Sequence, residues 1–358
     1  MVFQPIYLLP NWDIFLKSAK NISETVTFDY ICSLGRVLWG SWIYTRNNSH
    51  EKFKSIDYSE LYSAIASKLI GGEHLNKVLS IADCLAILSS RIGIVKPKLI
   101  STCQKLVAKN MAVCTYVDTE TGRFEIDYPS EPILAEAGAF LMHKSDNLNL
   151  IIKQLSFTIE SSLIDRGDRG EMIAKLILII AKDKARNSSQ LFHPLMYHNL
   201  SKVGEFIQSL FGKCLDNCGN IINGWKCKSE NEKCAIKIIN LQIENYTELL
   251  DGWINFNHFS RSKYWLKEID LVNGLKRCAA IHCKEYQTAV DLIIPIALDK
   301  SNFESISCIM VQVKLENQAS EPKYFQVFNK INSKLINGID LKKPSLLLYM
   351  QLGAPKQS

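Results

Sequence analysis

Apolar residues recur at helical spacing over the first part of the chain. The segment Phe28–Tyr44 carries one such stripe, and Leu61–Ile70 is a second amphipathic segment that ends at Gly71. An apolar helix face has to be covered by another element, because leaving it in water is unfavourable. The pattern therefore predicts a mainly helical region over residues 1–74.

The pattern changes between residues 75 and 130. Two helical runs, Leu75–Ser90 and Pro97–Lys109, precede two β-type segments, Met111–Val117 and Arg123–Tyr128. Helix, turn, helix and hairpin follow one another in winged-helix modules, whose second helix meets phosphates. That helix carries three lysines here: Lys98, Lys105 and Lys109. A plain helical pair capped by a hairpin explains the pattern equally well, so both interpretations stay open.

Residues 131–250 are predicted to be helical again. Before the apolar helix Met172–Ala185, the chain reads Ile164-Asp-Arg-Gly-Asp-Arg-Gly-Glu171. The charged side chains of this run could hold an anion or a ribose. However, Asp168 and Glu171 have capping-box spacing, and a helix start fixed by local ion pairs needs no ligand. The capping interpretation is therefore favoured.

The chain has 11 cysteines, an odd number spread along apolar patterns. Such cysteines indicate reduced core thiols and an intracellular protein. Four of them lie close enough in sequence to supply zinc ligands: Cys214, Cys218, Cys227 and Cys234. Only the first pair has the short spacing usual in zinc sites, so free thiols are the simpler interpretation.

Composition limits the classes of function that the chain can have. Its 358 residues, 47% apolar and 22% charged, suggest two or three folded domains. A net charge of +6 is too mild to indicate a nucleic-acid binder by itself. The longest apolar stretch is about half the length of a membrane span, and the start does not resemble a signal peptide, so we expect no membrane association. No P-loop, Gly-x-Ser-x-Gly or His-Glu-x-x-His motif occurs.

The last hundred residues carry the pattern that bears on chemistry. They predict, in order, a helix, three strands, a helix and a strand: Tyr264–Arg277, Cys278–Cys283, Ala289–Ala297, Ile306–Lys314, Pro322–Asn337 and Ser345–Gln351. Trp265, Ile269 and Val272 are expected on the buried stripe of the first helix, with Glu268 at its edge.

Two of the predicted strands carry isolated polar residues. Asp291 is the one acid of its strand, and the next strand carries Gln312 and Lys314, which period two places on one face. Burying an unpartnered polar group costs about 2–7 kcal/mol. These side chains therefore need each other, a divalent metal or a phosphate as partners. A turn residue at Asp291 and a solvated Lys314 are the alternative.

At these positions the chain resembles the PD-(D/E)XK, or restriction-endonuclease-like, nuclease superfamily. The matching residues are Asp291, Gln312 and Lys314, with Glu268 in place of the acid often contributed by the preceding helix. The resemblance implies a nuclease that depends on Mg²⁺ or Mn²⁺ and hydrolyses nucleic acid, in the first place DNA. It further implies a metal held by Asp291, Gln312 and the Val313 carbonyl, with Lys314 orienting the attacking water.

The same resemblance suggests substrate contacts and an alternative. Lys284 and Gln287 lie in a predicted turn where they would touch the nucleic-acid backbone. Gln312 departs from the commoner acid and removes one negative charge, which should weaken metal binding. A nuclease fold without catalysis, binding nucleic acid or a protein partner, is therefore the second hypothesis, and a helical scaffold is a third. Cutting both strands usually needs two sites, but the pattern shows no dimer surface, so self-association stays open.

More distantly, the chain resembles the C-terminal part of fungal Crinkler-type proteins. The resemblance rests on Ser130-Glu-Pro-Ile-Leu-Ala-Glu-Ala, on the run that ends at Glu171, and on the segments around Asp291 and Gln312. It implies an NTPase domain or partner that this chain lacks. It also implies an effector that acts in the nucleus of a target cell, besides the nuclear or cytoplasmic location of an ordinary intracellular protein.

Together these patterns predict an α+β protein. We expect a helical region over residues 1–74, a winged-helix-like module over 75–130, a second helical region over 131–250 and a restriction-endonuclease-like domain over 251–358. In that last domain a central mixed sheet would be flanked by helices.

Overall fold

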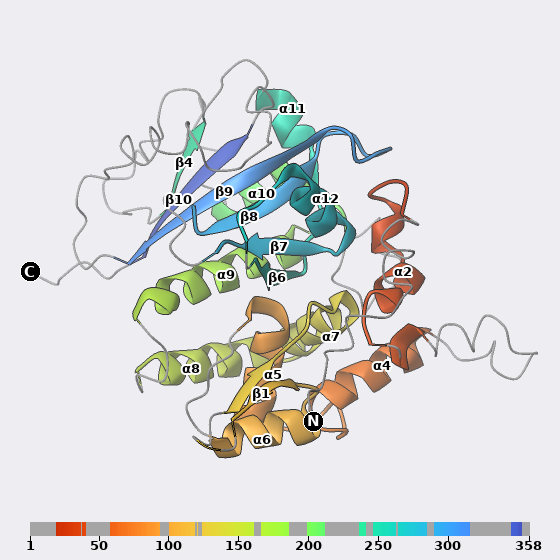
Figure 1. Ribbon diagram of the computed structural model, residues 1–358, viewed down its shortest axis with the longest axis vertical. Helices are drawn as coiled ribbons and strands as arrows, with labels where there is room; N and C mark the ends of the chain where they lie inside the picture. The colour runs from red at the N-terminus through yellow and green to blue at the C-terminus, as the bar shows by residue number, and fades with distance from the viewer. Residues whose placement is uncertain are drawn as a thin grey trace, which may run out of the picture.

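The computed structural model describes most of the chain in thirteen segments: residues 19–36, 38–40, 58–93, 100–118, 120, 124–160, 166–185, 199–211, 236–240, 246–262, 264–284, 290–315 and 345–352. Within them the fold is mixed α+β, with a helical part and a large mixed sheet (Figure 1).

Helices and one hairpin make up the lower part of Figure 1 and continue up its right-hand side, where the N-terminal elements lie beside the sheet. Its elements are a 3₁₀ turn η2 (Glu24–Val26), α2 (Phe28–Ser33), α4 (Tyr58–Leu69), α5 (Ile81–Ile92), α6 (Ile100–Lys109), β1 (Val113–Val117), β2 (Phe124–Asp127), α7 (Pro132–His143) and α8 (Asn147–Glu160). The predicted order of two helices and a hairpin is confirmed, because α5 and α6 precede the antiparallel pair of β1 and β2.

The predicted helix Leu75–Ser90 is wrong at both ends, because α5 begins at Ile81 and continues to Ile92. Ser80 and Asp83 form a capping box there: the Ser80 N–H donates to the Asp83 carboxylate over 2.8 Å, and the Asp83 N–H donates to Ser80 Oγ over 3.3 Å. These bonds satisfy backbone donors that have no partner inside the helix, which fixes where it starts.

The upper part of the molecule is an eight-stranded sheet with helices on its faces. Its strands are β3 (Ser201–Lys202), β4 (Ile236–Asn240), β5 (Trp253–Ile254), β6 (His258–Arg261), β7 (Ala279–His282), β8 (Leu292–Ala297), β9 (Ile306–Leu315) and β10 (Leu346–Leu352). Its helices are α9 (Arg166–Lys184), α10 (Val203–Phe211), α11 (Tyr246–Asp251) and α12 (Glu268–Lys276).

Strands β7, β8 and β9 form an antiparallel run, and β10 lies parallel to β9 on its other side. All four lie where the sequence predicts strands, and β9 has the central position expected from its apolar run. The predicted helix Pro322–Asn337 lies outside the described residues. The region 131–250 is not purely helical, because β3 and β4 join the sheet. β4 reads Ile-Lys-Ile-Ile-Asn, a short β-branched run that the helical interpretation missed.

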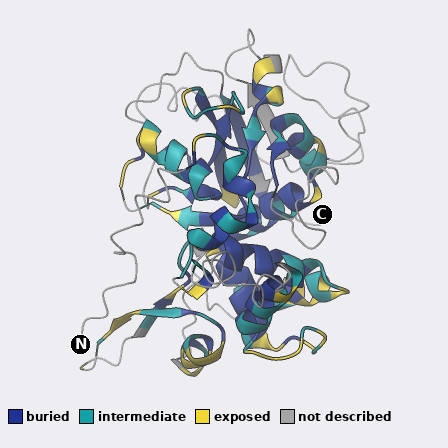
Figure 2. Ribbon diagram, turned by 90° about the vertical axis from the view of Figure 1, so that its right-hand side faces the viewer, coloured by how far each residue is buried: buried dark blue, intermediate teal, exposed yellow. Residues whose placement is uncertain are grey.

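The two faces of β9 pack on different helices. Ile309, Val311 and Val313 belong to the large core that also contains α9 residues, whereas Cys308 and Met310 pack in a second core with residues of α12. Figure 2 shows how the buried residues concentrate in the sheet and in the helices next to it, while the β1–β2 hairpin is more exposed. This alternation assigns the residues near the end of β9 to one helix-covered face or the other.

The stripe predicted for the helix after Tyr264 is wrong for Trp265 and Ile269, whereas Val272 is partly buried against the second core. Trp265 and Ile269 are 51% and 57% exposed, and the buried residues are Leu266, Leu271 and Leu275. The helix itself begins only at Glu268, so the stripe extrapolated back from Tyr264 had the wrong phase.

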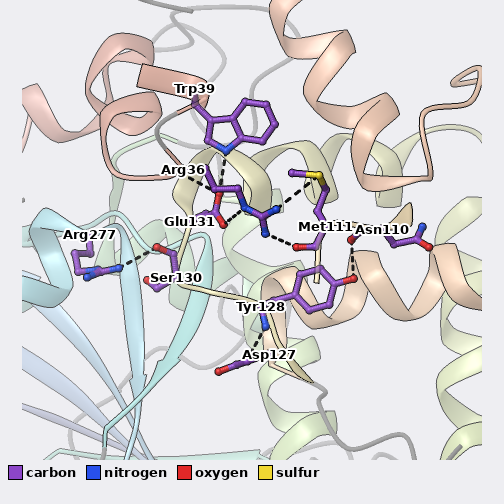
Figure 3. Close-up of polar contacts among 9 residues, drawn as sticks. All are labelled: Arg36, Trp39, Asn110, Met111, Asp127, Tyr128, Ser130, Glu131 and Arg277. Carbon is purple, nitrogen blue, oxygen red and sulfur yellow. Dashed lines mark hydrogen bonds and ion pairs between the residues drawn. The ribbon is translucent and has the colours of Figure 1, made fainter. Parts of the chain in front are cut away.

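Polar contacts hold the chain at Ser130 and Glu131, and one of them reaches the sheet. Glu131, which precedes α7, accepts hydrogen bonds from Arg36 Nε (2.8 Å) and Trp39 Nε1 (2.9 Å), and Arg277, which follows α12, donates to the Ser130 carbonyl over 2.9 Å (Figure 3). The two parts therefore share one continuous core and a polar joint. None of the helices within the described segments is long and apolar enough to cross a membrane.

Candidate functional site

Asp291 lies directly before β8, between β7 and β9. Its backbone N–H donates to the Val311 carbonyl and its carbonyl accepts from the Cys283 N–H, each over 2.9 Å. Its carboxylate Oδ2 accepts a hydrogen bond from the backbone N–H of Val313 over 2.6 Å. The carboxylate is thus half-buried and held against the strand that carries Gln312 and Lys314.

The surroundings of Asp291 change its acidity. Burial raises the pKa of this carboxyl to about 6, in spite of the Val313 N–H that stabilises its charged form. The negative charge of Glu171 also raises the pKa, whereas the ammonium of Lys314 lowers it. Asp291 is therefore electrostatically coupled to one acid and one base. Perturbed carboxyls of this kind are frequent at functional sites.

Gln312 and Lys314 differ sharply in exposure. Gln312 is 3% exposed, and its side-chain oxygen has no hydrogen-bond partner within the described part of the protein. Lys314, on the same face of β9 by alternation, is exposed. A buried oxygen without a partner costs about 1–3 kcal/mol. This oxygen is the atom that a cation or a donor would satisfy.

Asp291 and Gln312 carry oxygens of the kind that a hard cation takes as ligands. Mg²⁺ takes oxygen ligands, usually one or two carboxylates besides neutral oxygens and waters. Asp291 offers a carboxylate with one oxygen not engaged by Val313, and Gln312 offers the unpartnered amide oxygen. No group of three or more His, Cys, Asp or Glu side chains is placed to hold a metal in the described segments.

A second cluster lies around His282 at the end of β7. Glu171 Oε2 lies 2.6 Å from His282 Nε2, and Lys175 Nζ lies 3.0 Å from His282 Nδ1. Burial lowers the pKa of His282. Burial alone would raise the pKa of Glu171, but the hydrogen bond from His282 and the charges of Lys175 and Arg261 outweigh it and lower that pKa.

The Lys175 ammonium can only donate, and this assigns the hydrogen bonds in the cluster. A neutral imidazole donates from Nε2 to the Glu171 carboxylate and accepts at Nδ1 from the Lys175 ammonium. The hydrogen bond from His282 and the charges of Lys175 and Arg261 thereby keep the Glu171 carboxylate ionised. It belongs to α9, whose N-terminal turn packs on β9, since a Cβ on Gly170 would lie 3.5 Å from Val313 Cγ1.

Glu171 is the acidic residue that sequence reasoning missed at this site. We interpreted it as part of a capping pair with Asp168. That interpretation is wrong, because Asp168 lies inside α9, which is helical from Arg166. The signal was the dense run of charges up to Glu171, but 120 residues separate it from Asp291.

The other predicted residues are placed as follows. Glu268 is the first residue of α12 and is half-buried. The start of α12 lies near the end of β7, because Lys284 Nζ is 5.9 Å from the centre of the Trp265 ring. Glu268 is therefore at the same end of the sheet as Asp291, whereas the acid coupled to Asp291 is Glu171. Gln287 lies outside the described residues, as do Cys214, Cys218, Cys227 and Cys234.

Comparison with known proteins adds one finding. Residues 74–211 are similar to a domain of unknown function, DUF8736. The matched segment contains α5 to α10 and includes Glu171, but it ends before β8 and β9. No curated protein and no solved structure matches the chain.

Proposed function

We propose that this protein is a metal-dependent nuclease of the PD-(D/E)XK type that hydrolyses DNA phosphodiester bonds. The observation that carries the proposal is the Asp291 carboxylate, which is held on Val313 and coupled to Lys314 and Glu171. The succession α12, β7, β8, β9 and β10, with β10 parallel to β9, supports it as the described part of the expected arrangement.

In this proposal Mg²⁺ or Mn²⁺ would be held by Asp291, the Gln312 oxygen and the Val313 carbonyl, with Glu171 or Glu268 as a further acid. The metal would supply charge neutralisation and activation of a coordinated water. Asp291 has to be ionised for this, and the nearby Lys314 favours its charged form. The exposed ammonium of Lys314 would orient the attacking water and offset negative charge that develops on the phosphate.

Plasmid nicking tests the proposal. Supercoiled plasmid is incubated with the full chain and either Mg²⁺, Mn²⁺ or EDTA. We expect metal-dependent nicking that Asp291→Asn and Lys314→Gln each reduce by about 100-fold or more, since each removes a group that acts on the reacting atoms. The exposed Lys153 of α8 provides the control, and Lys153→Gln should nick like the wild type. Equal nicking by all variants would mean contamination and would refute the proposal.

The second candidate is a nuclease fold that binds nucleic acid or a protein partner without cleaving. The neutral Gln312 in place of an acid favours it, because the site then has one negative charge fewer for a cation. Binding of DNA that weakens steeply with salt, with no nicking in either metal, would support this candidate over the enzyme.

The winged-helix module remains part of the proposal as a second DNA contact. Lys105 and Lys109 lie on the exposed side of α6, and the hairpin strand β1 exposes Tyr116 and Val117 by 47% and 56%. Both features suit a helix and wing that face a phosphate backbone. An NTPase partner and a nuclear effector role follow only from the Crinkler resemblance, and self-association only from the two sites that duplex cleavage needs; all three remain predictions.

A further inference from the structure

Exposed aromatic side chains gather beside the candidate site. Seven described large apolar side chains are more than half exposed, and three of these, Tyr264 (78%), Trp265 (51%) and Ile269 (57%), lie within six residues around the start of α12. The intervening Leu266 is buried, so this segment is anchored while its aromatic rings face solvent. Fold stability does not require rings in this position.

Two lysines lie in sequence or in space beside the same rings, which the acids Glu268 and Asp270 of α12 follow. Lys267 and Lys284 are exposed, and the Lys284 ammonium lies 5.9 Å from the centre of the Trp265 ring. Lys284 directly follows Cys283, whose N–H donates to the Asp291 carbonyl. Lys284, which lies beside the Trp265 ring, is therefore one residue away from a backbone hydrogen bond to Asp291, the residue that carries the proposed function.

From this arrangement we infer that Tyr264, Trp265, Lys267 and Lys284 form a stacking platform for single-stranded nucleic acid next to the candidate site. Unstacked bases present flat faces to aromatic side chains, and lysines neutralise the phosphates between them. In a regular duplex the base faces are covered by their neighbours, so a duplex would use the lysines but not the rings. The inference rests on the proposed function, since it specifies the strand presented to that site.

Binding without metal tests the platform separately from cleavage. The full chain is titrated in EDTA into a fluorescently labelled oligothymidylate of about 20 nucleotides and into a matched hairpin duplex, with anisotropy as the readout. We expect Trp265→Ala to weaken binding to the single strand by roughly tenfold, because one stacked base is lost, and to change duplex binding by less than about twofold. Trp265→Phe, which keeps a ring, should restore most of the single-strand affinity.

Two control variants separate stacking from general apolar contact. Ile269→Ala removes an apolar side chain from the same surface, and Phe157→Ala removes an aromatic ring that is 59% exposed on α8. Both should bind the single strand within about twofold of the wild type, because neither removes a ring from the platform. Melting curves of every variant identify any that fails to fold.

Three outcomes would overturn the inference: unchanged single-strand binding by Trp265→Ala, an equal loss on the duplex, or displacement of the oligothymidylate by polyglutamate as effectively as by unlabelled oligothymidylate. The last result would identify a site for acidic peptides. If the platform binds as expected but neither plasmid nor the oligothymidylate is cleaved in Mg²⁺ or Mn²⁺, the proposed cleavage fails while the platform stands.

Discussion

Val313, the residue before Lys314, donates its backbone N–H over 2.6 Å to the carboxylate of Asp291. An acid at the start of β8 is thereby bound to the backbone of β9 at the position where the polar residues of that strand begin. The bond favours the ionised acid, but burial opposes it and leaves the pKa at about 6. The carboxylate is thus held in a position that does not favour its charge, as expected for a group kept for function.

The first prediction concerns the loss of stability that comes from burying the ionised carboxylate of Asp291. Because the pKa of Asp291 is higher in the folded protein than its ordinary value of 3.8, the stability that this group contributes is present below about pH 4 and is lost as pH rises through about 6. We expect Asp291→Asn to raise the free energy of unfolding by about 1–3 kcal/mol at pH 8, in EDTA, and to have little effect near pH 4. Urea unfolding at both pH values measures this.

Glu120→Gln, a change of an exposed acid in the hairpin turn, is the matched control and should leave both values within about 0.5 kcal/mol of the wild type. An Asp291→Asn variant that unfolds more easily at pH 8 would show that the ionised carboxylate stabilises the fold. The ionised carboxylate would then not lower the free energy of unfolding, and the prediction would be wrong.

The second prediction distinguishes the two acids near the site. Glu171→Gln keeps an oxygen that can accept from His282 but removes the charge that acts on Asp291. We expect it to reduce plasmid nicking by about 100-fold or more, whereas Glu268→Gln should stay within about threefold of the wild type. The opposite ranking would return the role of the helix acid to Glu268.

The strands of the candidate site could be predicted because their signal is local. Apolar runs bounded by turns gave β7 to β10, and the single polar residues within them gave Asp291, Gln312 and Lys314. Period two alone was enough to pair Gln312 with Lys314 on one face of β9. A prediction of this kind needs no knowledge of the rest of the fold.

Glu171 could not be found in the same way, because tertiary packing brings α9 to the sheet. The same charged residues can precede a helix as a capping pair or lie inside its first turns. The structure distinguishes the two cases, because α9 has already begun at Arg166. The exposure of Trp265 was missed for a related reason. Its assignment depended on the phase of a helix whose start the sequence did not define.

The third prediction tests how closely α12 packs on the sheet. A Cβ on Gly274 would lie 2.9 Å from Pro295 Cγ and 3.1 Å from the Ala279 carbonyl oxygen. We expect Gly274→Ala to destabilise the protein by about 1–3 kcal/mol, since overpacking exceeds the gain in helix propensity. A Cβ on Gly40 would meet no described atom within 4 Å, so Gly40→Ala should be neutral or slightly stabilising. Thermal melts of the two variants compare them directly, and an equally stable Gly274→Ala would contradict the tight packing.

The fourth prediction concerns the buried ion pair that joins α5 to α9. Arg91 donates to Asp183 through Nη1 (2.6 Å) and Nη2 (2.8 Å), and His143 Nε2 lies 2.7 Å from the same carboxylate. Burial alone would raise the pKa of Asp183, but the charge of Arg91 and the hydrogen bonds from His143 and Arg91 hold it at about 2. This lowered pKa makes a stabilising contribution that is present above about pH 4 and is lost as pH falls towards 2.

At pH 7, Asp183→Asn should therefore cost about 3–5 kcal/mol, because it leaves the Arg91 charge buried without its partner. The deficit relative to the wild type should narrow as pH falls from 4 towards 2, where the wild-type carboxylate itself becomes protonated. Asp251→Asn is the control, since Asp251 pairs with Lys202 over 2.7 Å at the exposed surface and should cost less than about 1 kcal/mol. Urea unfolding at intervals of pH measures both. A deficit for Asp183→Asn that stays constant down to pH 2 would mean that packing, and not the charge of Asp183, holds α5 against α9.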